Sequence, residues 1–258
     1  MAKFSLIGNP ISHSKSPALF KAAYGEGKHT YTLLEAPSCK EAMQRLKDEG
    51  ITGTNVTSPF KDEVMEYVSF PDKISSLLGS ANTIILKEGE LHSFNTDYYG
   101  VKNTLEEHLK RKSSQVKENG ESLTALVVGA GGAGKAAALA VAHMGMEVYL
   151  ANRSSHAAKP FAEKAGAQYI PLEDIPLLLP KTDILIYSLA MEIEQLKGVH
   201  LGGKIAFEAN YAHPNLVSSG AAEYIDGRFW LYNQAIGAFR LFTGEEPCTQ
   251  AMREVIGI

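Results

Sequence analysis

Two charged side chains, Lys61 and Asp97, stand where they could carry an acid–base step. Lys61 closes the stretch 55–61, and Asp97 lies in the stretch 94–100. Both stretches fall where a predicted strand ends or a helix begins, which in an open α/β sheet is the edge that binds ligands. A lysine beside a carboxylate in a closed cleft can give a proton to a carbonyl oxygen as hydride arrives. The competing interpretations are a solvated Lys61 and an Asp97 that only caps its helix.

Two further stretches, 8–17 and 80–83, place hydroxyl and amide groups at the same kind of position. Ser14 and Ser16, at a predicted helix start, can bind a carboxylate through their hydroxyls and the helix N–H groups. Together the four stretches offer several hydrogen-bonding groups, one cation and one anion, which suits a small polyhydroxylated acid. The alternatives are that Ser16 only caps a helix and that Asn55 and Asn82 only shape turns.

A glycine-rich turn near the middle of the chain predicts a dinucleotide site. The apolar run 125–128 is typical of a buried parallel strand, and the residues from Ala136 to Met144 favour a helix. Glycines at the turn let the backbone approach a pyrophosphate, whose charge is stabilised by N–H groups at the helix start. The alternative is a turn with only a packing role. The residues expected to bind the cofactor here are Gly129, Gly131, Gly132, Ala133 and Gly134.

The end of the next predicted strand indicates which dinucleotide binds. In an NAD site, a carboxylate about 20 residues after the glycines accepts a hydrogen bond from the ribose 2′-hydroxyl. Here the strand ends in Asn152-Arg153-Ser154, without an acid. Arg153 can hold a 2′-phosphate with a charge-assisted fork, and Ser154 adds a hydroxyl. We therefore predict NADP as the cofactor, bound by Asn152, Arg153 and Ser154; a solvated surface Arg153 is the alternative.

The elements that must position these groups alternate between strand and helix over residues 1–95, which predicts a parallel or mixed α/β sheet. Ser16 is expected to be the N-cap of the first helix, with Pro17 at its first position. The last two strands are expected to form a hairpin. The predicted strands are 4–7, 31–34, 53–57, 82–86 and 91–94, and the predicted helices are 16–24, 40–47, 60–68 and 74–78.

A second run of alternating elements follows a helix predicted from Thr96-Asp97 to about Lys112 and a polar connection, Ser113 to Ser122. Two last helices, 233–243 and 249–255, are expected to pack back on the first domain. The predicted strands of the second run are 125–128, 147–150, 168–170, 184–187 and 205–207, with a helix at 155–165.

The predicted fold class is therefore α/β, with two α/β domains and a ligand cleft between them. Residues 1–100 plus 234–258 form an N-terminal substrate-binding and catalytic domain, to which the C-terminal helices return. Residues 101–233 form a Rossmann-like dinucleotide-binding domain.

Composition and charge exclude several other classes of protein. The net charge is −4 with no block of lysine and arginine, so neither nucleic acid nor an anionic membrane is an expected partner. No apolar run is long enough for a membrane span or a signal peptide. Cys39 and Cys248 are far apart, without a CxxC motif or a close His/Cys cluster, which indicates a reduced, cytoplasmic protein without a metal. We expect a small-molecule substrate and a monomer or homodimer.

The ordered set of motifs resembles the shikimate dehydrogenase family, which includes shikimate/quinate dehydrogenases, over nearly the whole chain. The resemblance implies NADP-dependent, reversible reduction of 3-dehydroshikimate to shikimate, a step of aromatic amino-acid (chorismate) biosynthesis. The matching motifs are Ser14 with Ser16, Asn55-x-Thr57-x-Pro59-Phe60-Lys61, Asn82-Thr83, Asn95-Thr96-Asp97-x-x-Gly100, the glycine turn and Asn152-Arg153-Ser154.

The resemblance also implies individual roles. Lys61 and Asp97 are the catalytic residues, acting at the reacting hydroxyl. Gln234 reaches the substrate from the family's returning helix, and Tyr211 stands at the position of a tyrosine in the family's cleft. The residues that the resemblance places against the substrate are Ser14, Ser16, Asn55, Thr57, Asn82, Asp97, Tyr211 and Gln234.

The chain departs from the family's pattern after the glycine turn. An Asn-Ala-Thr run followed by Gly-Met is replaced by residues 187–191, which include Leu189, and Tyr-x-Pro becomes Tyr211-Ala212-His213-Pro214. Phe229 and Trp230 replace a glycine and a methionine before the last long helix, so we expect them either to crowd the nicotinamide or to stack on it. The alternative for Trp230 is packing at a domain seam.

Two other functions stay open at this point. A broader dehydrogenase of the same superfamily would accept quinate or use NAD; Ser14 in place of a bulkier threonine, and Arg153 without an acidic neighbour, weigh against it. A non-catalytic NADP- or metabolite-binding homologue is suggested by the altered region around Leu189. The presence of Lys61 and Asp97 argues against that function.

Overall fold

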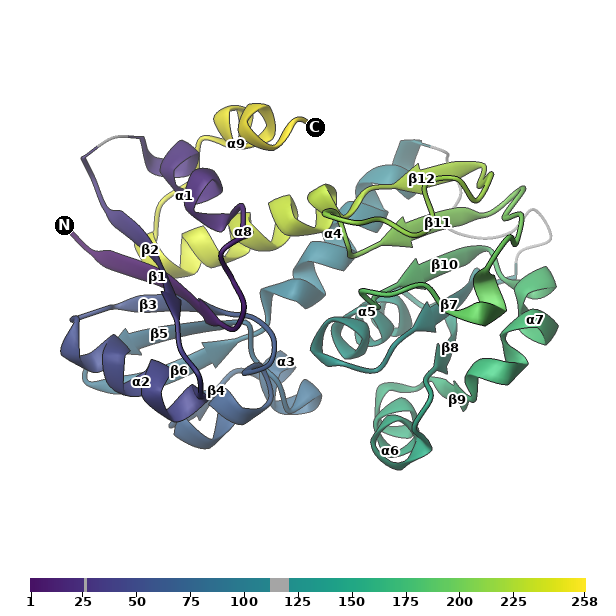
Figure 1. Cartoon of the computed structure of the whole chain (residues 1–258), viewed down its shortest axis with the longest axis horizontal. Helices are drawn as coiled ribbons and strands as arrows, with labels where there is room; N and C mark the ends of the chain where they lie inside the picture. Colours follow the sequence, from purple (N-terminus) through teal and green to yellow (C-terminus); the bar gives the residue numbers. More distant parts are fainter. Residues whose placement is uncertain (26, 112–120) are drawn as a thin grey trace. The chain divides into compact units, whose positions relative to one another are not determined.

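The computed structural model describes residues 1–25, 27–111 and 121–258, and the chain divides into two compact units, each built on one sheet (Figure 1). The first unit is Met1–Gly100 with Tyr232–Ile258, and the second is Val101–Leu231. Helices α4 (Thr96–Arg111) and α8 (Gly227–Thr243) each contribute residues to both units. The predicted fold class of two α/β domains is confirmed. The polar connection predicted at Ser113 to Ser122 lies largely outside the described residues.

The first unit contains a mixed sheet in the order β2-β1-β3-β5-β6-β4. The predicted hairpin is confirmed: β5 and β6 pair antiparallel through Glu88 and Gly89, which both have positive φ, as a two-residue type I′ turn requires. Its elements are β1 (Lys3–Gly8), α1 (Ser16–Tyr24), β2 (Thr30–Glu35), α2 (Cys39–Asp48), β3 (Gly53–Val56), the 3₁₀ helix η1 (Glu63–Tyr67), β4 (Phe70–Pro71), α3 (Lys73–Leu78), β5 (Thr83–Lys87), β6 (Glu90–Phe94) and, at the C-terminus, α9 (Thr249–Ile256).

Helices cover both faces of this first sheet. On one face Phe4 of β1 stacks on Phe242 of α8, and α1 and α9 lie side by side (Figure 1). On the other face Ile7 and Val56 belong to one buried cluster with Met43 and other residues of α2. Neighbouring residues of a strand therefore face different layers, as the two-residue period of a strand requires.

The second unit has a parallel sheet in the order β12-β11-β10-β7-β8-β9. Counted from β7, this is the 3-2-1-4-5-6 order of a doubly wound dinucleotide-binding fold, and its switch point lies between β7 and β10. Its elements are β7 (Thr124–Val128), α5 (Gly132–His143), β8 (Glu147–Ala151), α6 (Ser155–Ala165), β9 (Gln168–Ile170), η2 (Leu172–Asp174), α7 (Ile175–Leu178), η3 (Leu179–Lys181), β10 (Ile184–Tyr187), η4 (Glu194–Leu196), β11 (Ile205–Glu208) and β12 (Glu223–Ile225).

Two local predictions in the first unit are wrong. The helix predicted over 60–68 is only the 3₁₀ helix Glu63–Tyr67, because Ser69 already donates its N–H to Leu91 at the approach to β4. Ser16 is not an N-cap: Lys15 has that position, α1 begins at Ser16, and Pro17 follows as its second residue. The Ser16 hydroxyl is instead bonded to that of Ser14.

The last long helix also begins earlier than predicted, at Gly227 rather than Asn233. Asp226 accepts a hydrogen bond from the backbone N–H of Arg228 at 2.7 Å, which caps the new start. A Cβ on Gly227 would lie 2.4 Å from the Ala209 carbonyl oxygen, so glycine lets the helix begin against the end of β11. Strands β4 and β12 and helix α7 were not predicted.

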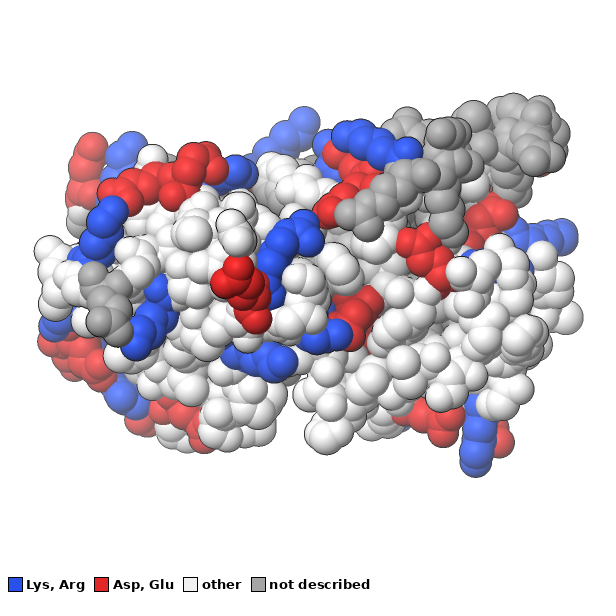
Figure 2. All heavy atoms as spheres, turned by 90° about the horizontal axis from the view of Figure 1, so that it is seen from above, with Lys and Arg blue, Asp and Glu red and all other residues white. Residues whose placement is uncertain are grey.

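The charged side chains do not single out one kind of partner. Acidic and basic residues are interspersed over the face that Figure 2 presents. Across residues 1–25, 27–111 and 121–258, none of the helices combines the length and the apolar character needed to cross a membrane.

The aromatic layer between α1 and α8 provides a test of the first unit's core. Phe20 is 2% exposed and stacks on Tyr31 at 4.3 Å between ring centroids. Phe20→Ala should lower the free energy of unfolding by about 3–5 kcal/mol, measured by urea unfolding followed by circular dichroism. Phe70→Ala, at a 55% exposed ring, should change it by about 0.5 kcal/mol or less. Equal effects of the two substitutions would contradict this packing.

Candidate active site

Asn82 holds the start of α4 in the first unit. Its Oδ1 accepts hydrogen bonds from the Thr96 backbone N–H at 2.6 Å and from the Thr96 and Thr83 hydroxyls at 3.1 Å each. Its Nδ2 donates to Gln234 Oε1 at 3.2 Å, and the Thr96 hydroxyl, whose single proton Asn82 Oδ1 and Gln234 Oε1 share, lies 3.1 Å from the same oxygen. The structure thus brings Asn82 and Gln234 together, although they lie 152 positions apart in the chain.

Asn55 extends this network to β2. Its Oδ1 accepts from the Tyr31 hydroxyl at 2.8 Å, and its Nδ2 donates to Thr83 Oγ1 at 3.2 Å and to the Asn82 carbonyl oxygen at 3.3 Å. Burial raises the pKa of Tyr31, and a hydrogen bond with Ser16 partly offsets the rise. Tyr31 therefore connects the serine pair to Asn55.

The serine pair lies just before and at the first residue of α1. Ser14 Oγ donates to Ser16 Oγ at 3.2 Å and accepts from the Ser16 backbone N–H at the same distance. Ser16 is buried, whereas Ser14 is half-buried. Each hydroxyl has one donor and two acceptor positions, so the bond between the two serines leaves positions for a further hydrogen-bond partner.

Lys61 and Asp97 form an ion pair with 2.5 Å between Nζ and Oδ2. Their side chains are only 18% and 9% exposed, so the charges attract one another in a poorly hydrated place. The Lys61 backbone is held too, because its carbonyl oxygen accepts from the Ala81 N–H at 2.8 Å. Asp97 stands in the first turn of α4, one residue after the position that Asn82 caps.

Thr57 is positioned by the close approach of two loops. Its backbone N–H donates to the Ile7 carbonyl oxygen at 2.9 Å, and Asn9 donates to the Ser58 carbonyl oxygen at 3.1 Å. A Cβ on Gly8 would lie 2.4 Å from Thr57 Cγ2, so the loops can meet only because residue 8 is glycine. The structure thus sets Thr57 beside the end of β1.

Tyr211 belongs to the second unit, in the segment that follows β11. The fully buried carboxylate of Glu208 holds this segment by accepting from the Asn215 N–H, the Asn215 Nδ2 and the Leu216 N–H at 2.6–2.9 Å. Within this segment Asn210 Oδ1 accepts a hydrogen bond from the His213 N–H at 3.1 Å, which forms a tight turn. A substrate contact of Tyr211 stays a prediction.

The glycine turn has the geometry that a phosphate site needs. Gly129 has a φ of +102°, and Gly131 is the N-cap of α5. The helical hydrogen bonds begin with Lys135 N–H to the Gly131 carbonyl oxygen at 2.9 Å, so the N–H groups of residues 132–134 are left for an anion. A Cβ on Gly131 would meet no atom within 4 Å, which leaves room for a ligand against the backbone.

The end of β8 contains the residues predicted to choose the dinucleotide. Asn152 Oδ1 accepts from the Ala130 N–H at 3.2 Å, which links β8 to the glycine turn. Arg153 and Ser154 are exposed, and within the described parts of the chain the Arg153 guanidinium makes no hydrogen bond or ion pair. This free fork and the open space at Gly131 fit a dinucleotide with a 2′-phosphate.

Three of the residues that depart from the family's pattern lie in two places. Leu189 lies after β10, and Phe229 and Trp230 lie in the first turn of α8. Leu189 follows β10 at the switch point, where its Cδ2 would be 2.8 Å from a Cβ on Gly129. Phe229 makes an edge contact with His108 of α4 at 5.2 Å between centroids. Trp230 is 4% exposed and packs on Phe207 of β11 within the second unit; packing at a domain seam stays a prediction.

Sequence reasoning missed several contributors to the site. Tyr31 stands inside a strand and Thr96 at a helix start, where each is easily taken for packing or capping. Glu208 gave a weak signal, an acid directly after an apolar strand. Among residues 1–25, 27–111 and 121–258, no group of three or more His, Cys, Asp or Glu side chains is placed to hold a metal.

The sheet order, the glycine turn and the polar network define a two-unit α/β protein with a dinucleotide-binding fold. Comparisons with known proteins identify the family. Residues 6–84 match the family model described as "Shikimate dehydrogenase substrate binding domain", and residues 111–199 match "Shikimate / quinate 5-dehydrogenase".

Curated relatives resemble the chain over nearly its full length. The shikimate dehydrogenase (NADP(+)) of Natronomonas pharaonis is 36% identical, covering 98% of this chain and 99% of its own. The enzyme of that name from Pyrococcus furiosus is 31% identical, covering 98% and 94%. The chain therefore belongs to the shikimate dehydrogenase family.

Solved structures share the fold. Shikimate 5-dehydrogenase from Thermus thermophilus, in complex with NADP(H) and shikimate, has a TM-score of 0.79 at 28% identity and covers 99% of this chain and 98% of its own. Shikimate dehydrogenase from Aquifex aeolicus has a TM-score of 0.85 at 25% identity, covering 99% and 97%.

Substitutions at two glycines of the turn should affect different properties, stability at Gly134 and NADP⁺ binding at Gly131. A Cβ on Gly134 would lie 1.9 Å from the Gly129 carbonyl oxygen, so Gly134→Ala should cost about 1–3 kcal/mol of stability. Gly131→Ala meets open space and should cost about 1 kcal/mol of stability or less, as an N-cap, yet raise the dissociation constant for NADP⁺ about tenfold or more, because the methyl occupies the phosphate's approach. Urea unfolding and calorimetric titration test both. Unchanged NADP⁺ affinity in a folded Gly131→Ala protein would contradict the site.

Proposed function

We propose that the chain is an NADP-dependent shikimate dehydrogenase, which reversibly reduces 3-dehydroshikimate to shikimate in aromatic amino-acid biosynthesis. The observation that carries the proposal is the Lys61–Asp97 ion pair beside the buried amide network of Asn55 and Asn82. The family relationship and the dinucleotide-binding fold of the second unit support the same reaction.

Lys61 and Asp97 are the proposed catalytic residues. In the direction of reduction, Lys61 Nζ donates a proton to the carbonyl oxygen of the substrate, and Asp97 stabilises the charged ammonium beforehand. In the direction of oxidation the same pair receives the proton of the reacting hydroxyl. Bound NADP supplies the hydride donor or acceptor.

The first unit is the proposed substrate-binding domain, over residues 1–100 plus 234–258. Its buried groups are already linked to one another, so the substrate meets donors and acceptors that need little reorganisation. Tyr211 is the proposed contribution of residues 101–233. The proposed substrate contacts are Ser14, Ser16, Asn55, Thr57, Asn82, Asp97, Tyr211 and Gln234.

The second unit is the proposed NADP-binding domain. The free N–H groups of Gly132, Ala133 and Gly134 would hold the pyrophosphate, and Arg153 would hold the 2′-phosphate with help from Ser154. Asn152 would act mainly by fixing the turn against β8. We place the enzyme in the cytoplasm, as a monomer or homodimer; the free thiols of Cys39 and Cys248 support a reducing compartment.

Removal of the proposed proton donor tests the reaction. The parent protein should reduce NADP⁺ when given shikimate, and Lys61→Ala should lower kcat by about 10²–10⁴, followed as absorbance of NADPH. Lys73→Ala, at an exposed lysine of α3, is the matched control and should be as fast as the parent. A fully active Lys61→Ala protein would refute the proposed role.

The cofactor assignment rests on Arg153. Arg153→Ala should raise the KM for NADP⁺ about 10- to 100-fold, because charge-assisted hydrogen bonds to the 2′-phosphate are lost, and should leave the KM for NAD⁺ unchanged. Arg153→Lys keeps the positive charge but loses the paired donors of the guanidinium. Its KM for NADP⁺ should therefore lie between those of the parent and of Arg153→Ala. An equal effect of Arg153→Ala on both cofactors would show that Arg153 does not select NADP.

The same assays separate the two alternative functions. The values of kcat/KM on shikimate and quinate, each with NADP⁺ and NAD⁺, should be compared. Similar or higher values with quinate or with NAD⁺ would identify a broader quinate dehydrogenase. Calorimetric binding of shikimate without any oxidation by the parent protein would identify a non-catalytic homologue.

A further inference from the structure

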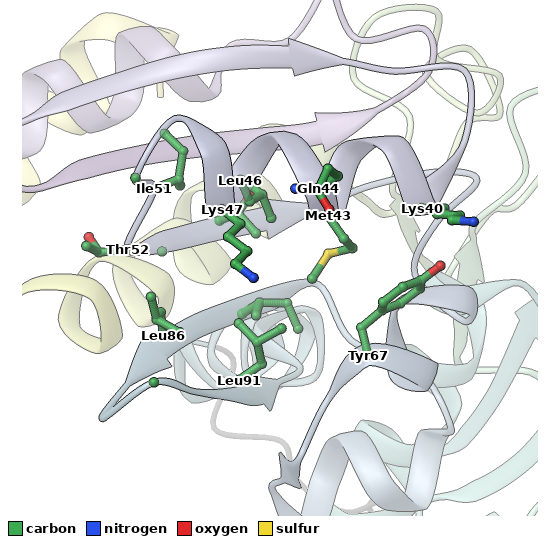
Figure 3. A pocket seen from close by; sticks show the side chains of 15 residues that line it. Lys40, Met43, Gln44, Leu46, Lys47, Ile51, Thr52, Tyr67, Leu86 and Leu91 are labelled. Atoms are coloured by element: carbon green, nitrogen blue, oxygen red, sulfur yellow. The ribbon is translucent and has the colours of Figure 1, made fainter.

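A groove of about 600 Å³ opens on the first unit between α2 and the β5–β6 hairpin (Figure 3). Met43 and Leu46 of α2 line one side, and Leu86 and Leu91 of the hairpin line the other. Its volume is within the range of small-molecule sites, which are mostly apolar with a few polar groups.

The groove exists because α2 covers the hairpin only in part. Leu86 and Leu91 are directly opposite in the β5–β6 register, so they share a face of the sheet with Ile84. Ile84 is buried in a cluster with Met43 and Leu46, whereas Leu86 is 44% exposed. The apolar face thus continues beyond α2 as an open groove.

Two lysines of α2, Lys40 and Lys47, line the groove, and Lys47 reaches over its apolar surface. In Figure 3 the side chain of Lys47 extends from α2 toward Leu91, beside Met43. Within the described ranges its ammonium has no hydrogen bond or ion pair, and the adjacent carboxylate of Asp48 is already bonded to Gln44 Nε2 at 2.9 Å. A cation above an apolar floor complements a ligand that has an apolar body and an anionic end.

The groove is separate from the candidate active site. Strand alternation directs Val56 of β3 toward α2, and its neighbour Asn55 toward the other face, where it bonds Tyr31. The ring of Tyr31 stacks on Phe20 of α1, which belongs to that other layer. A ligand in the groove would therefore lie on the opposite face of the sheet from Asn55.

We propose that this groove binds a small amphipathic anion with a flat, apolar ring system and one carboxylate. The ring system packs on Leu86, Leu91 and Met43, and the carboxylate accepts a charge-assisted hydrogen bond from Lys47 Nζ. The carboxylate is placed at Lys47 rather than at Lys40, because the Lys47 side chain extends over the apolar surface toward Leu91, whereas Lys40 extends away from it.

Methyl NMR on the full chain tests this proposal with naphthalene-2-carboxylate as the probe and naphthalene-2-carboxamide as its uncharged match. The carboxylate should shift the Met43 methyl resonance in a saturable way. Met252, buried in α9 on the other side of the first unit, should not respond. Lys47→Met should weaken carboxylate binding about fivefold, to the level of the amide, and Lys73→Met should leave it unchanged.

Three results would overturn the proposal. They are a Met43 methyl that does not respond to the carboxylate, an amide that binds the parent as tightly as the carboxylate does, and unchanged binding in a folded Lys47→Met protein. A Met43 shift that depends on protein concentration alone, with dimers in sedimentation, would assign the groove to a second copy and would equally overturn it.

Discussion

The hydrogen bond from the Thr96 N–H to Asn82 Oδ1 is the interaction on which the first unit's site depends. A helix start leaves N–H groups without partners, and here a side chain from the loop before β5, 14 positions earlier in the chain, satisfies one of them. The cap fixes where α4 begins and so fixes Asp97 in its first turn. Lys61 is held from the same side, because its carbonyl oxygen bonds the residue before Asn82. One short segment, 81–82, therefore sets both members of the ion pair.

The second unit shows a corresponding dependence on one contact between backbones. Gly134 approaches the Gly129 carbonyl oxygen so closely that no Cβ fits between them. This approach brings the start of α5 against the end of β7, at the switch point of the sheet. Gly131, three residues earlier, faces open space instead. Glycines of one motif thus serve packing and ligand access separately.

The sequence predicted the elements that carry these features because their signals are local. Apolar strands, the glycine turn and polar residues at strand ends identify the fold class and the stretches that contain Lys61 and Asp97. It could not show that Asn82 caps a helix 14 residues away, or that Tyr31 bonds Asn55, since such pairings depend on sheet order. The late start predicted for α8 has a different cause. The cap at its true start is a single side chain, Asp226, and one acidic residue after a short strand is a weak local signal for a helix start.

The donors and acceptors that remain unused in the first unit indicate which side chains would hold the structure and which would bind the substrate under the proposed function. Asn55 Nδ2 already donates to two acceptors, and Asn82 Oδ1 already accepts from three donors. These groups are best suited to hold the frame, because a buried polar group that loses its partner is costly. Lys61 has three donors and uses one on Asp97, and Ser14 and Ser16 are bonded chiefly to each other. Asn55 and Asn82 would therefore hold the frame while they contact the substrate, and Lys61 and the serine pair would supply the hydrogen bonds that the frame does not use.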